Sequence, residues 1–302
     1  MNVLSLFDGM SCGQIALNKA GIKIDKYFAS EIDQHAIKVT QANFPDTIQL
    51  GDVQNVTAEK VGKIDLLIGG SPCQGFSFAG KNLNFEDPRS KLFFEYVRLL
   101  KELKPKYFLL ENVRMKKESQ DIISECLGVE PIAINSNLVS AQNRFRLYWT
   151  NIPNVTAPND KGIILSDILE SGDTDREKSH CIDANYFKGG NLKSYFEKNR
   201  RQLVFTGGAL RGRYISQDPA KTQQQLEIRF DGKSNALNTV RRTTLAVDLE
   251  SLTYRKLTPL ECERLQTVPE GYTDHVSNTQ RYRMLGNGWT VDVIKHILGG
   301  IK

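Results

Sequence analysis

The chain has 302 residues and a formal net charge of +5, and 40% of its residues are hydrophobic while 25% are charged. That length and composition favour a globular protein with one large domain and a smaller one, and no apolar stretch approaches the roughly 20 residues that span a bilayer, which excludes a transmembrane helix. Five cysteines without a C-x-x-C pair argue against a disulfide framework or a zinc site and favour the reducing cytoplasm.

The first half of the chain alternates short apolar runs with longer amphipathic ones. The first run follows no basic segment, so we interpret it as a strand and not as a signal peptide. The alternation predicts an α/β fold with a doubly wound, mostly parallel, Rossmann-like sheet. Strands are expected at 2–7, 26–30, 47–50, 64–68, 107–110, 131–135 and 144–150, and the clearest helices at 11–20, 34–43 and 90–103.

The sequence changes character at about Asn151. Proline and glycine interrupt the periodic pattern, and Thr, Gln and Arg become frequent, which predicts loops and short strands. One helical stretch is expected at 259–266, and a last helix at 291–298. We therefore expect a smaller, irregular second domain at 151–273, with 1–150 and 274–302 forming the first domain.

Positive charge is concentrated in part of the second domain. Residues 178–256 contain fifteen Lys or Arg and seven Asp or Glu, a net charge of +8, so the rest of the chain carries −3. Such a concentration is typical of a face that binds nucleic acid. Charge alone leaves open the alternative of a basic surface that only faces solvent.

Acidic residues and a glycine turn follow the first three predicted strands. Phe7-Asp8-Gly9-Met10-Ser11-Cys12-Gly13 leads into a helix, and Glu31 ends the second strand about twenty residues later, where an acid can accept ribose hydroxyls. The third strand ends at Gly51-Asp52-Val53. Because ligands bind outside the carboxyl ends of strands in an open α/β sheet, these residues predict a nucleoside site, although Glu31 alone is equally compatible with a surface acid.

The first turn also constrains what is attached to the nucleoside. It is not a G-x-G-x-x-G motif, and Asp8 would repel a pyrophosphate at the start of the following helix. A nucleoside whose attached group is cationic suits this acid better. S-adenosylmethionine carries a sulfonium and an ammonium group, so we expect it to be the cofactor.

A cysteine stands at the tip of the fourth predicted strand. The apolar run 64–70 is followed directly by Ser71-Pro72-Cys73-Gln74, in which Pro72 fixes the backbone, and Gly75 then lets the chain turn away. This arrangement presents a thiol at the mouth of the sheet as a nucleophile, and the next strand ends in Glu111-Asn112-Val113, which supplies an acid nearby. A Pro-Cys pair alone is more often not catalytic, so the prediction depends on its position and on that acid.

Further motifs occur downstream at Gln142-Asn143-Arg144-Phe145-Arg146, 257–266 and Leu285-Gly286-Asn287. Together with those after the first, fourth and fifth strands, they resemble the ordered motifs of DNA (cytosine-5) methyltransferases, over nearly the whole chain and in the compact form found in bacteria and phages. The resemblance implies the fold of S-adenosylmethionine-dependent methyltransferases. It makes the first domain the cofactor-binding catalytic domain and the second the target-recognition domain.

The resemblance also implies catalytic roles. Cys73 would add to C6 of cytosine, which makes C5 nucleophilic toward the methyl group, and Glu111 would neutralise charge on the ring. Arg146 would hold the cytosine O2, and Arg144, two residues away on a predicted strand, would point to the same face. Positive charge there would favour the thiolate. Phosphate contact or an exposed strand face stays open as an alternative for this arginine pair.

Cofactor contacts carry over in the same way. Glu31 would bind the ribose, Ile32 would lie against the adenine face, and Asp52 and Val53 would contact the adenine edge. Phe7, Asp8, Gly9, Met10 and Ser11 would form the methionine end. The remaining expected members of this site are Pro72, Leu92, Asn287 and Trp289, of which Leu92 and Asn287 would close it.

Cytosine stacked in a duplex is closed to a nucleophile, so such an enzyme must extrude its base. Residues 75–91 are expected to form a mobile lid over that base. The basic domain should read sequence through loops at 206–213 and 238–244. Because arginine pairs with guanine O6 and N7 in the major groove, the candidates are Arg211, Arg213, Arg241 and Arg242.

Two other functions stay open. The same chemistry on tRNA is one, although the Cys-Phe-Thr signature of those relatives is absent here. The other is a binding or regulatory protein without catalysis, although such chains typically lose the cysteine or the acid. We expect a monomeric cytoplasmic enzyme of a bacterial or phage-infected cell, which acts on double-stranded DNA and needs neither a membrane nor a metal.

Overall fold

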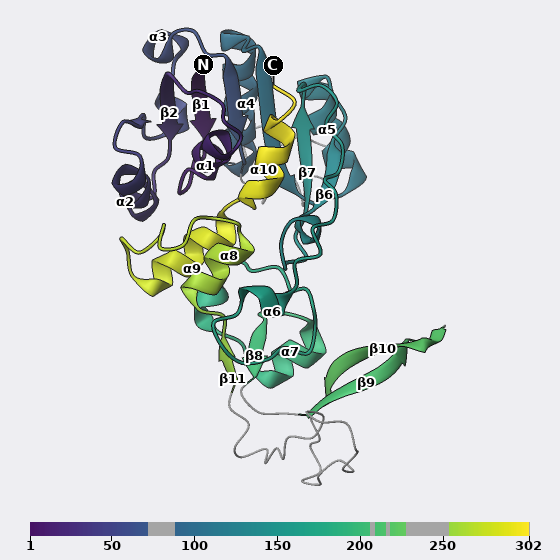
Figure 1. The fold of residues 1–302 in the computed structure, drawn as a ribbon. Coiled ribbons are helices and arrows are strands. Elements are labelled where there is room, and N and C mark those ends of the chain that lie inside the picture. Colours follow the sequence, from purple (N-terminus) through teal and green to yellow (C-terminus); the bar gives the residue numbers. More distant parts are fainter. Residues whose placement is uncertain (72–87, 206–208, 216–217, 228–253, 302) are drawn as a thin grey trace.

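The computed structural model describes residues 1–71, 88–205, 209–215, 218–227 and 254–301. Pro72, Cys73, Arg241 and Arg242, the loop 238–244 and most of the expected lid therefore lie outside the described residues. Figure 1 shows two parts, a sheet covered by helices and a smaller irregular part, with the chain crossing between them more than once.

The larger part is built on one seven-stranded sheet with the order β3-β2-β1-β4-β5-β7-β6. All neighbouring strands from β3 to β5 run parallel, whereas β7 is antiparallel to both β5 and β6. The predicted doubly wound, mostly parallel α/β sheet is thereby confirmed. The strands are β1 (Asn2–Leu6), β2 (Lys26–Ser30), β3 (Ile48–Gln49), β4 (Leu66–Gly69), β5 (Tyr107–Val113), β6 (Ile132–Asn135) and β7 (Phe145–Thr150).

Helices cover both faces of this sheet, so its central strands are apolar without alternation. Every residue of β4 is buried, and two hydrophobic clusters lie on the opposite faces of the sheet. One includes residues of α1 and α10, and the other includes residues of α4 and α5 (Figure 1). The helices of this part are α1 (Cys12–Lys19), α2 (Gln34–Asn43), α3 (Ala58–Val61), α4 (Pro88–Leu103), α5 (Lys117–Leu127) and α10 (Val291–Leu298), with 3-10 turns η1 (Val53–Asn55) and η2 (Ser136–Leu138).

The smaller part has little regular structure. Strands β8 and β11 pair antiparallel, and β9 and β10 form a hairpin that projects away from the body in Figure 1. The prediction of a loop at 206–213 is wrong for residues 209–213, which belong to β9. The elements are α6 (Leu165–Ile168), η3 (Tyr186–Lys188), α7 (Leu192–Lys198), β8 (Leu203–Phe205), β9 (Ala209–Ile215), β10 (Asp218–Glu227) and β11 (Tyr254–Lys256).

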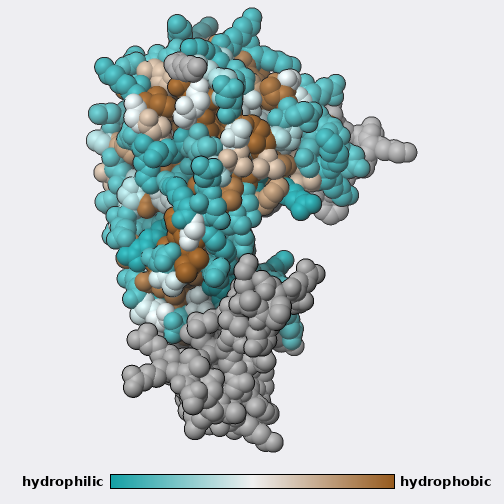
Figure 2. Space-filling model, turned by 45° about the vertical axis from the view of Figure 1, so that its right-hand side comes forward, coloured by the Kyte–Doolittle hydropathy of each residue, from teal (hydrophilic) through white to brown (hydrophobic). Residues whose placement is uncertain are grey.

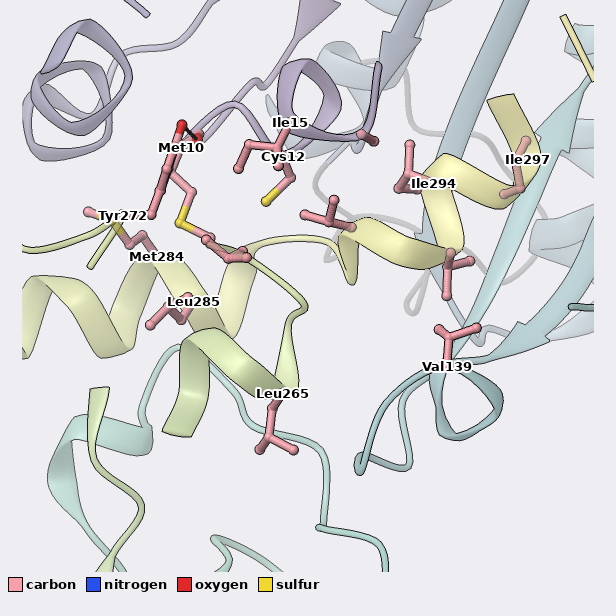
Figure 3. Packing of buried hydrophobic residues seen from close by; sticks show 14 of the residues in the cluster. Met10, Cys12, Ile15, Val139, Leu265, Tyr272, Met284, Leu285, Ile294 and Ile297 are labelled. Atoms are coloured by element: carbon pink, nitrogen blue, oxygen red, sulfur yellow. Dashed lines mark hydrogen bonds between the residues drawn. The ribbon is translucent and has the colours of Figure 1, made fainter. Parts of the chain in front are cut away.

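Two helices join the parts, α8 (Pro259–Leu265) and α9 (Asn278–Asn287). Thr258 and Glu261 form a capping box with proline in the first turn, so the sequence itself starts α8. Figure 3 shows Leu265, Tyr272 and Leu285 in the core that also contains α1 and α10, and the Tyr272 hydroxyl donates to the Met10 carbonyl at 2.8 Å. The junction is therefore packed on the sheet and not only on the smaller part.

On the face in Figure 2 hydrophilic residues predominate, and hydrophobic ones form separate patches. No helix in the described part of the chain is long and apolar enough to cross a membrane.

Candidate active site

A cavity of about 520 Å³ opens at the carboxyl ends of β1, β2, β4 and β5, a volume typical of small-molecule sites. This is the edge at which the strand-end residues were expected to meet. Residues predicted from sequence that line it are Phe7, Asp8, Gly9, Glu31, Ile32, Asp52, Val53, Leu92, Glu111, Arg144, Arg146, Asn287 and Trp289.

Two predicted cofactor residues, Met10 and Ser11, are described but do not line the cavity. The Met10 side chain is buried in the core beside Tyr272 and Met284 (Figure 3). The Ser11 side chain is also buried, and its hydroxyl donates to Asp8 Oδ2. Both residues therefore support the turn with buried side chains that do not line the cavity.

Of the candidate DNA-reading residues, two belong to a described strand and two lie outside the described residues. Arg211 and Arg213 are on β9. The register places them opposite Gln225 and Gln223 of β10.

The cavity also has lining residues to which the sequence analysis assigned no role. Ser71 and Cys12 belong to predicted motifs and Gly70 directly precedes one, so position in the chain was the available signal. Burial raises the pKa of the Cys12 thiol to about 12, which keeps this part of the wall neutral. Further unpredicted lining residues come from the end of α9 and the glycine after it, namely Arg283, Met284, Gly286 and Gly288.

The turn after β1 is held in an unusual backbone conformation. Phe7, Gly9 and Ser11 have φ values of 57°, 58° and 60°, in the left-handed region that costs a residue other than glycine about 1–2 kcal/mol. Glu31 holds this turn, because its Oε2 accepts from the Gly9 N–H at 2.7 Å. Its Oε1 accepts from the N–H groups of Ile32 and the following residue at 2.7 and 2.8 Å. One carboxylate thus fixes the ends of two strands.

Asp8 contributes a carboxylate inside this turn. It accepts the Tyr27 hydroxyl at 2.8 Å as well as the Ser11 hydroxyl. Burial raises the pKa of Asp8 to about 6, and the negative charge of Glu31 acts in the same direction. At neutral pH the cavity therefore holds an anionic charge that has been brought out of water, and a cationic ligand would offset that cost.

The end of the cavity that is lined by Ile32, Asp52 and Val53 fits a nucleoside. Ile32 is 69% exposed although it is aliphatic, and its side chain lies on the cavity wall. Asp52 accepts from the Gln54 N–H at 3.0 Å, Val53 is buried, and the Ser30 hydroxyl donates to the Gly51 carbonyl at 2.7 Å. Carboxylates for hydroxyls and a cation, beside apolar side chains for a ring, match the chemistry of S-adenosylmethionine.

The opposite end of the cavity is built around Glu111. Strand β5 continues to Val113, so this buried acid lies within the strand and not after its end. The Arg146 Nε lies 2.9 Å from Glu111 Oε1, but its N–H has no aligned acceptor among the described atoms, so the contact is an ion pair more than a hydrogen bond. The Trp289 Nε1–H donates to Glu111 Oε2 at 3.0 Å.

The two arginines of the predicted pair are used differently. Strand β7 begins at Phe145, so Arg144 precedes the strand by one residue, and both arginines line the cavity. The buried Arg144 guanidinium donates to three carbonyl oxygens, those of Ile182, Gly286 and Gly288, at 3.1, 3.2 and 2.8 Å. Burial lowers its pKa from the usual arginine value. Arg144 therefore ties the smaller part and the end of α9 to the sheet.

The backbone next to the expected nucleophile is also restrained. Asn112 is buried in β5, and its Nδ2 donates to the Ser71 carbonyl at 3.3 Å and lies 3.4 Å from the Ser71 Oγ. Ser71 is on the cavity wall two residues before Cys73 in the chain. Among the described residues, no cluster of three or more His, Cys, Asp and Glu is placed to hold a metal ion.

Comparisons with known proteins agree with this geometry. The family model for C-5 cytosine-specific DNA methylases matches residues 1–127 and 132–302. Type II methyltransferase M1.ScrFI of Lactococcus lactis subsp. cremoris is 30% identical over 309 residues, covering 98% of this chain and 76% of the relative. Type II methyltransferase M.HpaII of Haemophilus parainfluenzae is 29% identical over 322 residues, covering 97% and 86%.

The fold has known counterparts as well. The structure of the Entamoeba histolytica methyltransferase EhMeth superimposes with a TM-score of 0.72 at 18% identity, and the match covers 100% of this chain and 99% of that one. At that identity the likeness concerns the fold alone.

Proposed function

The chain belongs to the family of C-5 cytosine-specific DNA methylases, and from this membership we propose which of its residues carry out methyl transfer from S-adenosylmethionine to cytosine in duplex DNA. The observation that carries the proposal is the cavity itself. A carboxyl paired with an arginine, Glu111 with Arg146, lies in the same cavity as Glu31 and Ile32, which suit a nucleoside. Ring chemistry and cofactor binding thus share one site.

The cofactor end is assigned as follows. Glu31 binds the ribose hydroxyls, Ile32 covers one adenine face, and Asp52 with Val53 contacts the adenine edge. S-adenosylmethionine supplies the methyl group when bound, and the negative charge of Asp8 attracts its cationic end. Phe7 and Gly9 line that end, Met10 and Ser11 support the turn from behind, and Pro72, Leu92, Asn287 and Trp289 complete the enclosure.

The reacting end uses three residues. The Cys73 thiolate adds to C6 of cytosine, and the electron density this delivers makes C5 nucleophilic. Glu111 neutralises charge at N3 while Arg146 holds O2. C5 takes the methyl group, whose bond to the sulfonium sulfur breaks, and loss of the C5 proton then breaks the C6–sulfur bond and releases the thiolate. Support for Cys73 comes from Ser71 on the cavity wall, which Asn112 restrains. We assign Arg144 a structural role in this site, because its guanidinium donates hydrogen bonds to backbone carbonyl oxygens.

Target recognition falls to the smaller part. Residues 178–256 carry a net charge of +8, as binding to duplex DNA requires, and Arg211, Arg213, Arg241 and Arg242 are the proposed base readers. We keep 1–150 with 274–302 as the proposed catalytic domain and 151–273 as the proposed target-recognition domain, and one hydrophobic cluster contains residues of both. We propose a monomer that needs no metal and acts in the cytoplasm of a bacterial or phage-infected cell.

The test is methyl transfer by the purified chain. With S-adenosylmethionine labelled in its methyl group, we expect label in duplex DNA and not in tRNA, and bisulfite sequencing should show a fixed target sequence. Cys73→Ala should abolish transfer while DNA binding remains. Cys126→Ala, a cysteine on α5 outside the cavity lining, is the matched control and should keep full activity.

Two results would contradict the proposal. Label that enters only tRNA would overturn the substrate, and turnover retained by Cys73→Ala would overturn the nucleophile. Duplex DNA with 5-fluorocytosine at the target should form a covalent adduct, because fluorine cannot leave as a proton does. An adduct that forms equally with Cys73→Ala would assign the attack to another residue.

A further inference from the structure

Trp289 lies where the two ends of the cavity meet. It lines the cavity, and its indole N–H donates to Glu111 Oε2 at 3.0 Å. The other oxygen of the same carboxyl, Oε1, faces the Arg146 Nε at 2.9 Å. Both carboxyl oxygens of Glu111 thus have a nitrogen neighbour, and the two nitrogens come from segments far apart in the chain.

The position of the indole is itself restrained. The carbonyl of Gly288, directly before Trp289, accepts from Arg144 at 2.8 Å and from the Gln266 side chain at 3.3 Å. Gly70 leaves room for the contact, because a Cβ there would lie 3.0 Å from the Trp289 Nε1 and 3.1 Å from Glu111 Oε2. The peptide that carries Trp289 is therefore held by two side chains, and the space beside its N–H is kept open.

We propose that Trp289 is a positioning residue for Glu111, a role that rests on the proposed function of that carboxyl. The terminal torsion of a glutamate is broad and roughly two-fold, so a carboxyl held at one oxygen can still turn. The Arg146 Nε–H is not aligned with Oε1, which makes the indole N–H the better-directed of the two restraints. Trp289 fixes the carboxyl plane, so that Glu111 meets the cytosine ring in one orientation.

Arg144 contributes to the same positioning of Glu111, but it acts indirectly, through the chain that carries Trp289. Its hydrogen bonds to the carbonyls of Gly286 and Gly288 fix the chain before Trp289, and its bond to Ile182 connects that chain to the smaller part. The arginine expected to help at the thiolate thus acts through Trp289 on the acid.

Trp289→Phe tests the proposal because it keeps an aromatic wall and removes only the N–H. We expect kcat at saturating cofactor to fall roughly ten- to hundredfold, as for the loss of a hydrogen bond to a charged acceptor. The Kd for S-adenosylhomocysteine should stay within about threefold of wild type, since the ring remains. Trp149→Phe, which removes an indole N–H bonded to Ser124 Oγ in the core, is the matched control and should lower stability without lowering kcat.

A double-mutant cycle separates positioning from general damage. In a Glu111→Ala background, which leaves the indole N–H no carboxyl to position, adding Trp289→Phe should cause no further fall in the rate of adduct formation with 5-fluorocytosine duplex. A full further fall there would overturn the proposal, because the indole would then act without the acid. Gly70→Ala, which crowds the same contact, provides a second variant and should lower kcat in the same direction.

The outcomes distinguish this proposal from the proposed function. If the wild-type chain methylates duplex DNA and Trp289→Phe keeps wild-type kcat, the positioning role alone is overturned. If the wild-type chain methylates no DNA, the proposed function fails, and the positioning role fails with it.

Discussion

The two ends of the cavity are constructed in different ways. At the cofactor end, strand ends that are near neighbours in sequence meet, and one carboxylate, Glu31, bonds to the backbone of both. At the reacting end, Glu111 meets a tryptophan 178 residues away and an arginine from an antiparallel strand. The first end is local and is held by backbone hydrogen bonds, whereas the second depends on how α9 and α10 dock on the sheet.

This difference separates the residues that we propose take part in the reaction from the residues that position them. The cofactor end can form wherever β1 and β2 pair. The reacting end also needs the junction, in which Arg144 and Gln266 hold the carbonyl before Trp289. Substitutions at the junction should therefore affect stability and the acid together, while those at the cofactor turn should stay local.

The largest effect is expected for Arg144→Ala. It removes the guanidinium donor of the Ile182 and Gly286 carbonyls and one of the two side-chain donors of the Gly288 carbonyl, which should lower the free energy of unfolding by about 3–5 kcal/mol. Urea denaturation measures this change in the free energy of unfolding. Arg283→Ala, an exposed arginine on α9, is the control and should change stability by less than about 0.5 kcal/mol. Equal losses for the two would mean that the junction does not depend on the buried guanidinium.

Arg146→Ala should affect the catalytic rate more than the stability of the fold. Its guanidinium faces Glu111 at the cavity, so we expect kcat to fall by about 10²–10³, as when one electrostatic donor is removed from an active site, with a smaller loss of stability than for Arg144→Ala. Single-turnover methylation measures the chemical step. Lysine at this position should not restore the rate, because it lacks the planar fork. If Arg146→Ala instead kept kcat and unfolded readily, the two arginines would have exchanged roles.

Local pattern predicted most of the larger part. The bounds of β2, α2 and α10 agree with the sequence-based ranges, because each is a periodic run that ends at polar or glycine residues. Helix α9 was missed. It is rich in Asn, Gln and Arg, with Tyr282 and Leu285 among its few buried apolar residues, so its stability comes from packing between the two parts and not from its own periodicity.

The candidate site was predictable to the extent that its residues stand at strand ends. Residues such as Glu31 and Glu111 line the cavity because parallel strands bring their carboxyl ends to one edge. Met10 could not be placed in this way, since the left-handed φ values on both sides of it turn its side chain into the core. The contact of Trp289 with Glu111 could not be predicted either, because it depends on tertiary docking across 178 residues.

Asp8→Asn tests whether the ionised carboxylate of Asp8 lowers the stability of the folded protein. The pKa of Asp8 in the folded protein is about 6 against an ordinary value of 3.8. Between these values the folded state holds a proton that the unfolded chain has released, so this contribution to stability is complete below pH 4 and is lost as the pH rises through 6. Asparagine does not titrate, so the variant should gain about 2–3 kcal/mol relative to wild type between pH 4 and pH 7.

The same variant should bind S-adenosylmethionine more weakly at pH 7, because it removes the carboxylate that we propose attracts the cationic end of the cofactor. Denaturation at a series of pH values and calorimetric titration measure the two effects. A stability difference that does not change with pH would show that Asp8 is already ionised in the folded protein throughout this range.

The smallest effect concerns the strained turn at Ser11, which has φ 60° and donates its hydroxyl to Asp8. Ser11→Ala and Ser11→Gly both lose that bond, but only alanine keeps the cost of the left-handed conformation, so the glycine variant should be more stable by about 1 kcal/mol. The same pair of changes at Ser124 inside α5 provides the control. There the glycine variant should be the less stable by about 1 kcal/mol, and only a reversal of sign between the two sites locates backbone strain at the cofactor turn.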